Sequence, residues 1–174
     1  MSCDKLNSIL KACKDDVGIG GIRRAFVFDM EDIDQEVLAD ATMTVTTLTL
    51  TDNAVEFNFK RNTAQHTTTP EIDLVAGSTF YNHVISLRFG RRKASKSVAL
   101  QLLAQGQRDL GVVYEDANGD YWYVREAQMS GGEETTGQAK ADNSAYEVEL
   151  TAEMTTRAFG IAKADAEALL SQVS

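Results

Sequence analysis

Residues 80–89 read FYNHVISLRF, and this stretch decides the fold of the chain. Alternate side chains form one face that is apolar or aromatic apart from a histidine: Tyr81, His83, Ile85, Leu87 and Phe89. The positions between them are mostly polar, as at Asn82, Ser86 and Arg88. A period of two residues is typical of a β-strand that buries one face. The sequence therefore predicts a strand here, with His83 on its buried side.

A short helix is expected after this strand. Ser95 or Ser97 can cap a helix that runs to Gln105, and Gly106 can end it. Its predicted buried stripe comprises Val98, Ala99, Leu102 and Leu103.

A hairpin is expected next, with strands at 111–115 and 121–125 on either side of Asn118-Gly119. This pair favours the positive φ angles of a tight turn. Asp116, Asn118 and Asp120 also match the start of a calcium loop. That alternative fails because Tyr121 stands where such a loop needs glycine, and Ala127 stands at its bidentate glutamate position.

Further elements are predicted on both sides of this region. A strand is expected at 146–150, where Tyr146, Val148 and Leu150 alternate with Glu147 and Glu149, followed by a terminal helix at 163–173. Towards the N-terminus, the pattern predicts a helix at 4–14, a strand at 23–30, and a hairpin of 42–51 with 55–59 around Asp52-Asn53. The polar segments 61–78 and 130–144 are expected to be extended loops.

Composition limits the classes of function. The chain has 174 residues, enough for one domain at 1–174, and a formal net charge of −9. A surface of that sign repels nucleic-acid phosphates. No stretch reaches the roughly 20 apolar residues that span a bilayer, and no secretion signal is evident, so we expect no membrane contact.

No catalytic or metal site is predicted. Cys3 and Cys13 are too far apart along a helix for a good disulfide, and with isolated His66 and His83 they do not form a zinc motif. His66 is expected to be an exposed loop histidine, and the acids near residue 30 are expected to be solvated rather than metal-bound. Because no nucleophile, metal-protease or phosphate-loop motif is present, we expect a protein that is not an enzyme and needs no cofactor.

One basic cluster stands out in this acidic chain: Arg88, Arg91, Arg92, Lys93 and Lys96. No aromatic residues interleave with these bases, as a single-strand binding platform would require. Pairing with an acidic patch on another copy is at least as plausible, since opposite charges register subunits.

Residues 79–155 resemble the tail tube proteins of long-tailed bacteriophages. The resemblance is carried by the order of elements: the strand 81–89, the helix 97–105, the hairpin Asn118-Gly119-Asp120-Tyr121, the glycine-bearing loop 130–143, and the strand 146–151. It covers somewhat under half of the chain, and none of its motifs is diagnostic by itself. The helices expected at 4–14 and 163–173 are less typical of that family.

The resemblance implies a fold that is mainly β with some α: a β-sandwich or partial barrel with one flanking helix. The residue patterns add the short N-terminal and C-terminal helices. The resemblance also implies rings, commonly hexameric, that stack into the tail tube of a virion, through which DNA passes without specific binding. The partners would be copies of this chain and other phage tail or connector proteins, and assembly would take place in the host cytoplasm. A head-to-tail connector, tail terminator or hub ring is the alternative role.

A different class of function remains open, a monomeric β-sandwich that binds a small ligand or carbohydrate on Tyr121, Trp122 and Tyr123. Under the assembly hypothesis, the basic cluster and the two loops supply the expected subunit contacts: Arg91, Arg92, Lys93, His66, Pro70, Gly131 and Gly132.

Overall fold

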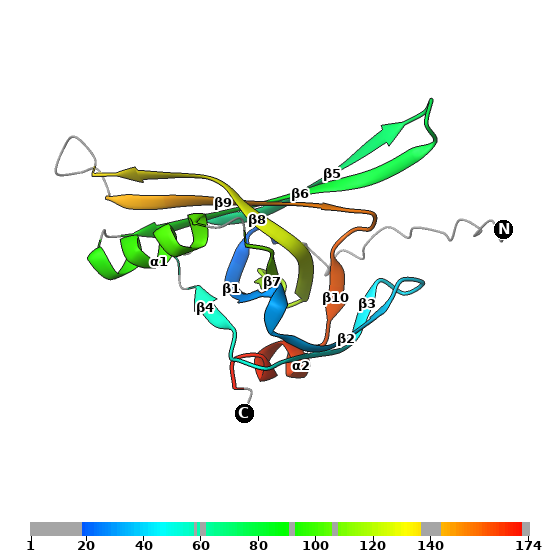
Figure 1. The fold of residues 1–174 in the computed structure, drawn as a ribbon, viewed down its shortest axis with the longest axis horizontal. Helices are drawn as coiled ribbons and strands as arrows, with labels where there is room; N and C mark the ends of the chain where they lie inside the picture. Colours follow the sequence, from blue (N-terminus) through cyan, green and yellow to red (C-terminus); the bar gives the residue numbers. More distant parts are fainter. Residues whose placement is uncertain are drawn as a thin grey trace.

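The computed structural model describes residues 19–57, 59, 62–90, 93–105, 108–136 and 144–171. The helix expected at 4–14, with both cysteines, lies outside these residues, as do Arg91 and Arg92. The described chain is mainly β, with two α-helices, as the sequence predicted (Figure 1).

The strands form two sheets that share one strand. The lower sheet in Figure 1 has the order β2-β3-β10-β8-β7-β1-β4. Its members are β1 (Ile22–Asp29), β2 (Ile33–Ala39), β3 (Thr44–Leu50), β4 (Val55–Phe57), β7 (Leu110–Asp116), β8 (Tyr121–Thr135) and β10 (Phe159–Ile161). The upper sheet has the order β5-β6-β9-β8, with β5 (Ala64–Asp73), β6 (Ser78–Gly90) and β9 (Ala145–Met154). A single turn of 3-10 helix, η1 (Met30–Asp32), joins β1 to β2.

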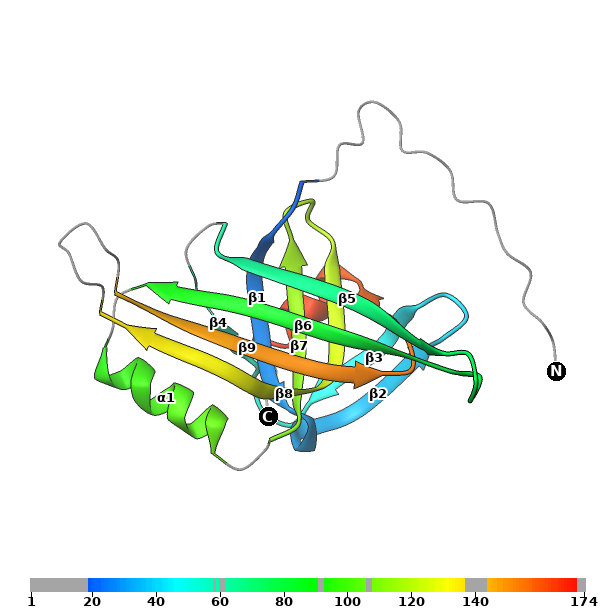
Figure 2. The same cartoon turned by 90° about the horizontal axis from the view of Figure 1, so that it is seen from above.

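Strand β8 passes from one sheet into the other. Its first half pairs with β7 and β10, and its second half, from Gln128, pairs with β9. Glu126 has a φ of 54°, and the register shifts between Met129 and Gly131. Such irregularities bend a strand, and the two sheets cross at a steep angle (Figure 2).

The core fills the space between the sheets. Its largest fully buried side chains include Phe26 from β1, Tyr123 from β8, Ile85 and Leu87 from β6, and Leu150 from β9. The alternation that predicted β6 is confirmed, because Ile85 and Leu87 are buried and Arg88 between its buried neighbours is exposed. The hairpin at Asn118-Gly119 is also confirmed, with Gly119 at a φ of 94°.

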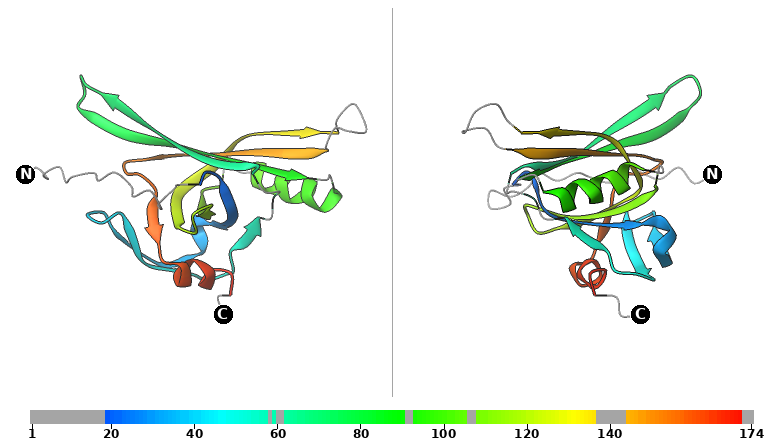
Figure 3. Two further views of the ribbon diagram at one scale, coloured as in Figure 1. Left: turned by 180° about the vertical axis from the view of Figure 1, so that it is seen from behind. Right: turned by 60° about the vertical axis from the view of Figure 1, so that its left-hand side comes forward.

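The two helices lie outside the sheets. Helix α1 (Ala94–Ala104) flanks the upper sheet near the ends of β8 and β9, and α2 (Lys163–Ala168) lies below the lower sheet (Figures 1 and 3). The predicted stripe of α1 is only partly right. Leu103, a member of that stripe, packs against the core together with Leu100, which was not predicted, whereas Val98 and Leu102 are 57% and 52% exposed. The Ser97 hydroxyl bonds the hydroxyl of Tyr146 (2.6 Å) on the neighbouring strand β9.

The expected loop at 61–78 is wrong, because most of it forms β5 and the beginning of β6. Every residue of β5 pairs with β6, and the connecting turn spans only residues 74–77. The expected loop at 130–144 is also too long, since β8 continues to Thr135. Both stretches lack the apolar alternation of a half-buried strand, yet their backbones are satisfied by a long neighbouring strand.

The predicted hairpin of 42–51 with 55–59 is wrong as well. Strand β3 pairs with β2 and β10, whereas β4 pairs with β1. The chain crosses between the two at Ala54, whose N–H donates to Leu169 O (2.9 Å). Phe57, on β4, packs its ring edge-on against Phe89 of β6, with the ring centroids 5.6 Å apart.

Candidate assembly surface: an acidic sheet face with two open edges

The upper sheet has four complete rows of paired residues across all its strands. Two rows point to the core, Ala64-Leu87-Val148-Gly132 and His66-Ile85-Leu150-Met129. The alternate rows point away from it, Gln65-Ser86-Glu149-Gly131 and Thr67-Val84-Thr151-Gln128. Directly paired residues share a face, so these rows define an inner face and an outer face.

The outer face is polar and acidic. Its described residues carry six carboxylates: Glu71, Asp73, Glu133, Glu147, Glu149 and Glu153. Arg88 supplies the one cationic side chain among the described outer-face positions of these paired strands. No helix or strand of the described chain covers this face in the views of Figures 1 and 2. The net charge of the protein is therefore concentrated, in part, on one broad surface.

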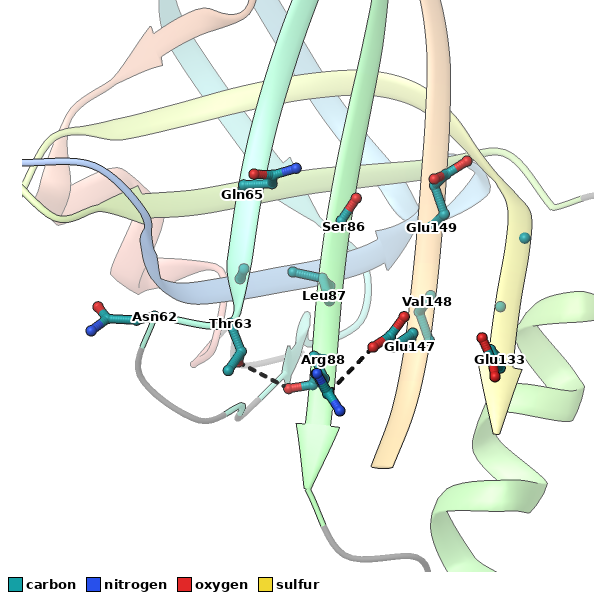
Figure 4. A pocket seen from close by; sticks show the side chains of 13 residues that line it. Asn62, Thr63, Gln65, Ser86, Leu87, Arg88, Glu133, Glu147, Val148 and Glu149 are labelled. Atoms are coloured by element: carbon teal, nitrogen blue, oxygen red, sulfur yellow. Dashed lines mark hydrogen bonds and ion pairs between the residues drawn. The ribbon is translucent and has the colours of Figure 1, made fainter. Parts of the chain in front are cut away.

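A shallow hollow of about 510 Å³ lies on this face (Figure 4). Arg88 and Glu147 meet there on neighbouring strands, with Nε and Oε1 3.4 Å apart. Gly131 leaves space beside Glu149, because it contributes no side chain to its row. The hollow has polar and charged walls, without the apolar enclosure that usually holds a small ligand.

Both lateral edges of the upper sheet are open in the described chain. Strand β5 pairs only with β6, and residues 128–133 of β8 pair only with β9. Such edges present unpaired backbone groups that can bind another strand. Each of the three pairings is antiparallel, so β5 and β8 run in opposite directions.

Pro70 divides β5 into two parts. Before it, β5 belongs to the four-stranded sheet; after it, β5 and β6 continue as a two-stranded arm, since β9 ends opposite Tyr81 (Figure 2). Proline has no N–H to donate and is tolerated at sheet edges. The edge that can bind a neighbouring strand therefore lies mainly in residues 64–69.

The inner face carries a polar cluster that the sequence did not reveal. His66 lies on β5 and bonds His83 on β6, with Nε2 and Nδ1 3.0 Å apart. The Tyr114 hydroxyl bonds His66 Nδ1 (2.5 Å), and His83 Nε2 bonds Thr156 O (3.1 Å). The expectation of an exposed loop histidine at 66 is therefore wrong: its ring contacts come from the same chain.

The Thr156 carbonyl oxygen, which can only accept a hydrogen bond, fixes the direction of the other bonds in the cluster. The Thr156 carbonyl accepts, so His83 Nε2 carries a proton and its Nδ1 must accept from His66 Nε2. His66 Nδ1 then accepts from Tyr114. Burial and the neighbouring His83 lower the pKa of His66 from 6.5 to about 4, and burial lowers the pKa of His83 as well. Both imidazoles are neutral at pH 7.

This cluster could have been predicted from the sequence only by first predicting that β5 pairs with β6. Thr68, whose hydroxyl lies 3.2 Å from His66 Nε2 and 3.3 Å from His83 Nδ1, is paired with His83 across the hairpin. Asp73 and Gly77, which close the turn, were the available signal for that hairpin.

The other predicted contact residues are spread over the upper sheet. Lys93 precedes α1, and its N–H donates to the Tyr146 hydroxyl (3.3 Å). Pro70 is exposed on the edge, and Gly131 lies on the outer face. Gly132 lies on the inner face, where an added Cβ would come within 2.9 Å of Glu147 O. Whether these residues contact another copy stays a prediction.

The features considered for ligand binding have other roles. Tyr121 and Tyr123 are buried, so residues 121–123 do not form an exposed aromatic platform. Asp116 Oδ1 accepts the N–H groups of Asn118 and Asp120 and thereby supports the turn. Within the described ranges, no three His, Cys, Asp or Glu side chains are grouped as a metal site, and no helix is long and apolar enough to cross a membrane.

Comparisons of the chain with protein-family models, curated proteins and solved structures found no match.

Proposed function

We propose that this chain is a virion structural protein whose copies join through the edges of the upper sheet into rings, which stack as a phage tail tube. The observation that carries the proposal is the pair of open edges, β5 and residues 128–133 of β8, on either side of an acidic face. Main-chain bonds between β5 of one copy and β8 of the next would close the ring.

The strand directions favour this closure. Because β5 and β8 run oppositely, β8 of one copy placed beside β5 of the next continues the antiparallel order. Each copy contributes four strands, an even number, so the order holds around a ring of any size. Repeated head-to-tail contacts that close on themselves are a common way to build rings.

The acidic face would line the channel. If six copies formed the ring, its 24 strands at about 4.8 Å spacing would give a diameter of about 37 Å between backbones, which strand tilt would widen. Glu147, Glu149 and Glu153 would then face DNA phosphates and repel them. DNA could pass such a wall without binding to it. No catalytic chemistry is part of this role, and the site of action would be the virion tail.

A head-to-tail connector, tail terminator or hub ring would use the same two edges and is the alternative within this class. A monomeric ligand-binding module is less well supported, since the aromatic side chains that suggested it are largely buried.

Size-exclusion chromatography with negative-stain microscopy of the purified chain tests the proposal. We expect discrete oligomers or concentration-dependent tubes, seen as rings with a central channel. A chain that elutes as a monomer across a hundredfold range of concentration, without rings on the grid, would refute the proposed function.

A further inference from the structure

Strand β5 is attached to the rest of the molecule mainly by polar contacts. Ala64 is its one buried residue, and the side chains from Gln65 to Asp73 are exposed or half-buried. Its backbone pairs with β6 along the whole strand. His66 joins it to the lower sheet, because its Nδ1 accepts from the Tyr114 hydroxyl of β7 (2.5 Å). An edge strand that buries so little apolar surface opens more easily than its neighbours.

The neighbouring strands of the upper sheet are held in a different way. Strand β6 fully buries Ile85 and Leu87, and β9 fully buries Leu150. Their attachment to the core is apolar and does not change with pH. Polar contacts that depend on protonation are therefore concentrated on β5 and the residues that it touches.

The residues that hold β5 form the histidine cluster: His66, Thr68, His83, Tyr114 and Thr156. In its neutral form Tyr114 donates to His66, His66 donates to His83, and His83 donates to the Thr156 carbonyl. Each of these three protons has one acceptor, and all four ring nitrogens are in use. A further proton finds no free ring nitrogen in the cluster.

An added proton breaks a bond at either histidine. On His66 Nδ1 it would face the Tyr114 hydroxyl, whose own proton would then lose its acceptor. On His83 Nδ1 it would face the proton of His66 Nε2 across 3.0 Å. The Thr68 hydroxyl, 3.2 Å from His66 Nε2 and 3.3 Å from His83 Nδ1, can accept one of these two protons only after the bond between the rings is lost. Protonation therefore removes contacts that hold β5 in place.

The surrounding elements offer the cluster no carboxylate partner among the bonds of the described residues. Strand β6 contributes His83, β7 contributes Tyr114, and β9 places the uncharged Ala152 opposite His83. Charged groups of adjoining segments are engaged elsewhere: Arg23 with Glu115, Arg24 with Glu56, Asp116 with its own turn, and Arg157 with the ring of Tyr81. An imidazolium in the cluster would therefore be buried without a counter-ion, which agrees with a pKa of about 4 for His66.

We propose that the histidine cluster is an acid-operated latch for the edge strand β5: uptake of a proton by the cluster releases β5 from β6 and from the lower sheet, while β6, β9 and β8 stay paired. Protonation of buried histidines changes packing in this way in pH-sensing proteins. The latch goes beyond the proposed function and does not depend on it. Any contact that another molecule makes through the β5 edge would be lost in acid.

Hydrogen–deuterium exchange of the dilute wild-type chain, followed by mass spectrometry from pH 7 to pH 4.5, tests the latch without a substitution. Correction for the intrinsic exchange rate at each pH gives protection factors. Because opening takes up one proton, we expect the protection of residues 64–69 to fall by about tenfold per pH unit between about pH 6 and 4.5. Residues 146–152 of β9 should lack this slope. Loss of protection by both segments together, or no pH dependence in β5, would overturn the inference.

The double variant His66→Gln/His83→Gln tests whether the histidines are the cause. Each carboxamide can accept one hydrogen bond and donate another, as the rings do, but cannot take up a proton in this range. We expect the slope in residues 64–69 to disappear. The control Glu71→Gln removes an exposed carboxylate from the same strand and should keep the wild-type slope. A slope retained by the double variant would overturn the inference.

The imidazole Hε1 signals of wild type give a readout that needs no variant to fold. They should shift over the same pH range in which β5 loses protection. Titration of both rings near pH 6.5, while β5 stays protected, would contradict the latch.

Assembly distinguishes this inference from the proposed function. Rings formed at pH 7 should dissociate at pH 4.5 in wild type and persist in the double variant. Absence of rings at pH 7 would refute the proposed function, and the exchange result would still decide the latch. Rings that persist at pH 4.5 with β5 released would show that this edge is not the ring contact.

Discussion

Gly132 shows at the residue scale why a glycine can be required inside a strand. Its hypothetical Cβ would lie 2.9 Å from Glu147 O and 3.0 Å from Met129 Cε, whereas that of the adjacent Gly131 meets only Glu149 Cβ at 3.9 Å. The first environment includes a backbone carbonyl that cannot move without disturbing the β8–β9 pairing. The second is an ordinary van der Waals contact.

The two glycines therefore provide a matched pair of variants. We expect Gly132→Ala to lower the free energy of unfolding by about 1–3 kcal/mol through overpacking, and Gly131→Ala to change it by less than about 0.5 kcal/mol. Urea denaturation, at a concentration where both variants are monomeric, measures the difference. Equal midpoints would show that β8 and β9 move apart more easily than the structure indicates.

The histidine cluster predicts how stability depends on pH. The folded pKa of His66 is lowered to about 4 by burial and by His83, so the unfolded chain binds more protons between about pH 6.5 and 4. The stabilisation from neutral His66 is full above pH 6.5 and is lost as the pH falls towards 4. The shift corresponds to roughly 3 kcal/mol at most.

Urea midpoints measured from pH 7 to pH 4.5 test this dependence. We expect wild type to lose more stability over that interval than His66→Gln, which cannot titrate there, although the variant is less stable at pH 7. The comparison removes the contribution of carboxylates common to both proteins. Parallel pH profiles would mean that His66 does not titrate with a lowered pKa.

At the scale of elements, the sequence was most informative where a strand buries one face. Strands β6 and β9 and the β7–β8 hairpin show clear alternation or a specific turn, and the structure has them at the expected places. Strand β5 has no such signal, because between Ala64 and Ile72 its inward positions are His66, Thr68 and Pro70 rather than aliphatic residues. Its strand structure depends on pairing with β6. A pairing between two segments cannot be predicted from the periodicity of one segment alone.

Long-range pairing also explains the error at β3 and β4. Asp52-Asn53 is a reasonable hairpin turn, and both flanking segments favour strands. Strand β3 instead pairs with β2, which was not predicted, and β4 with β1. A local turn preference of this kind is weaker than the burial of Phe57 against Phe89 and of the core face of β3. The acidic face and the open edges became apparent only once these pairings were known.

At the scale of the whole molecule, the charge of the outer face can be reversed without touching the core. Glu149→Lys/Glu153→Lys changes two exposed outer-face residues, and Glu31→Lys/Asp165→Lys makes the same change in charge on η1 and α2. If the outer face lines a channel, the first variant should assemble normally and bind a short single-stranded oligonucleotide at low salt. Binding should weaken steeply as salt rises.

Co-sedimentation of the oligonucleotide with assembled protein, across a salt series, measures this effect. The η1 and α2 variant is the control, because its added lysines would lie outside the channel. Similar retention of the oligonucleotide by both variants would show that the acidic face does not line the bore.

Strand β8 belongs to both sheets, so the main chain of one strand connects the upper sheet to the lower sheet. A pulling force on the upper sheet would therefore pass into the lower sheet along a covalent backbone as well as through side-chain packing. The two sheets should resist mechanical separation as one unit, and a load applied at the edge of the molecule would be carried into its core.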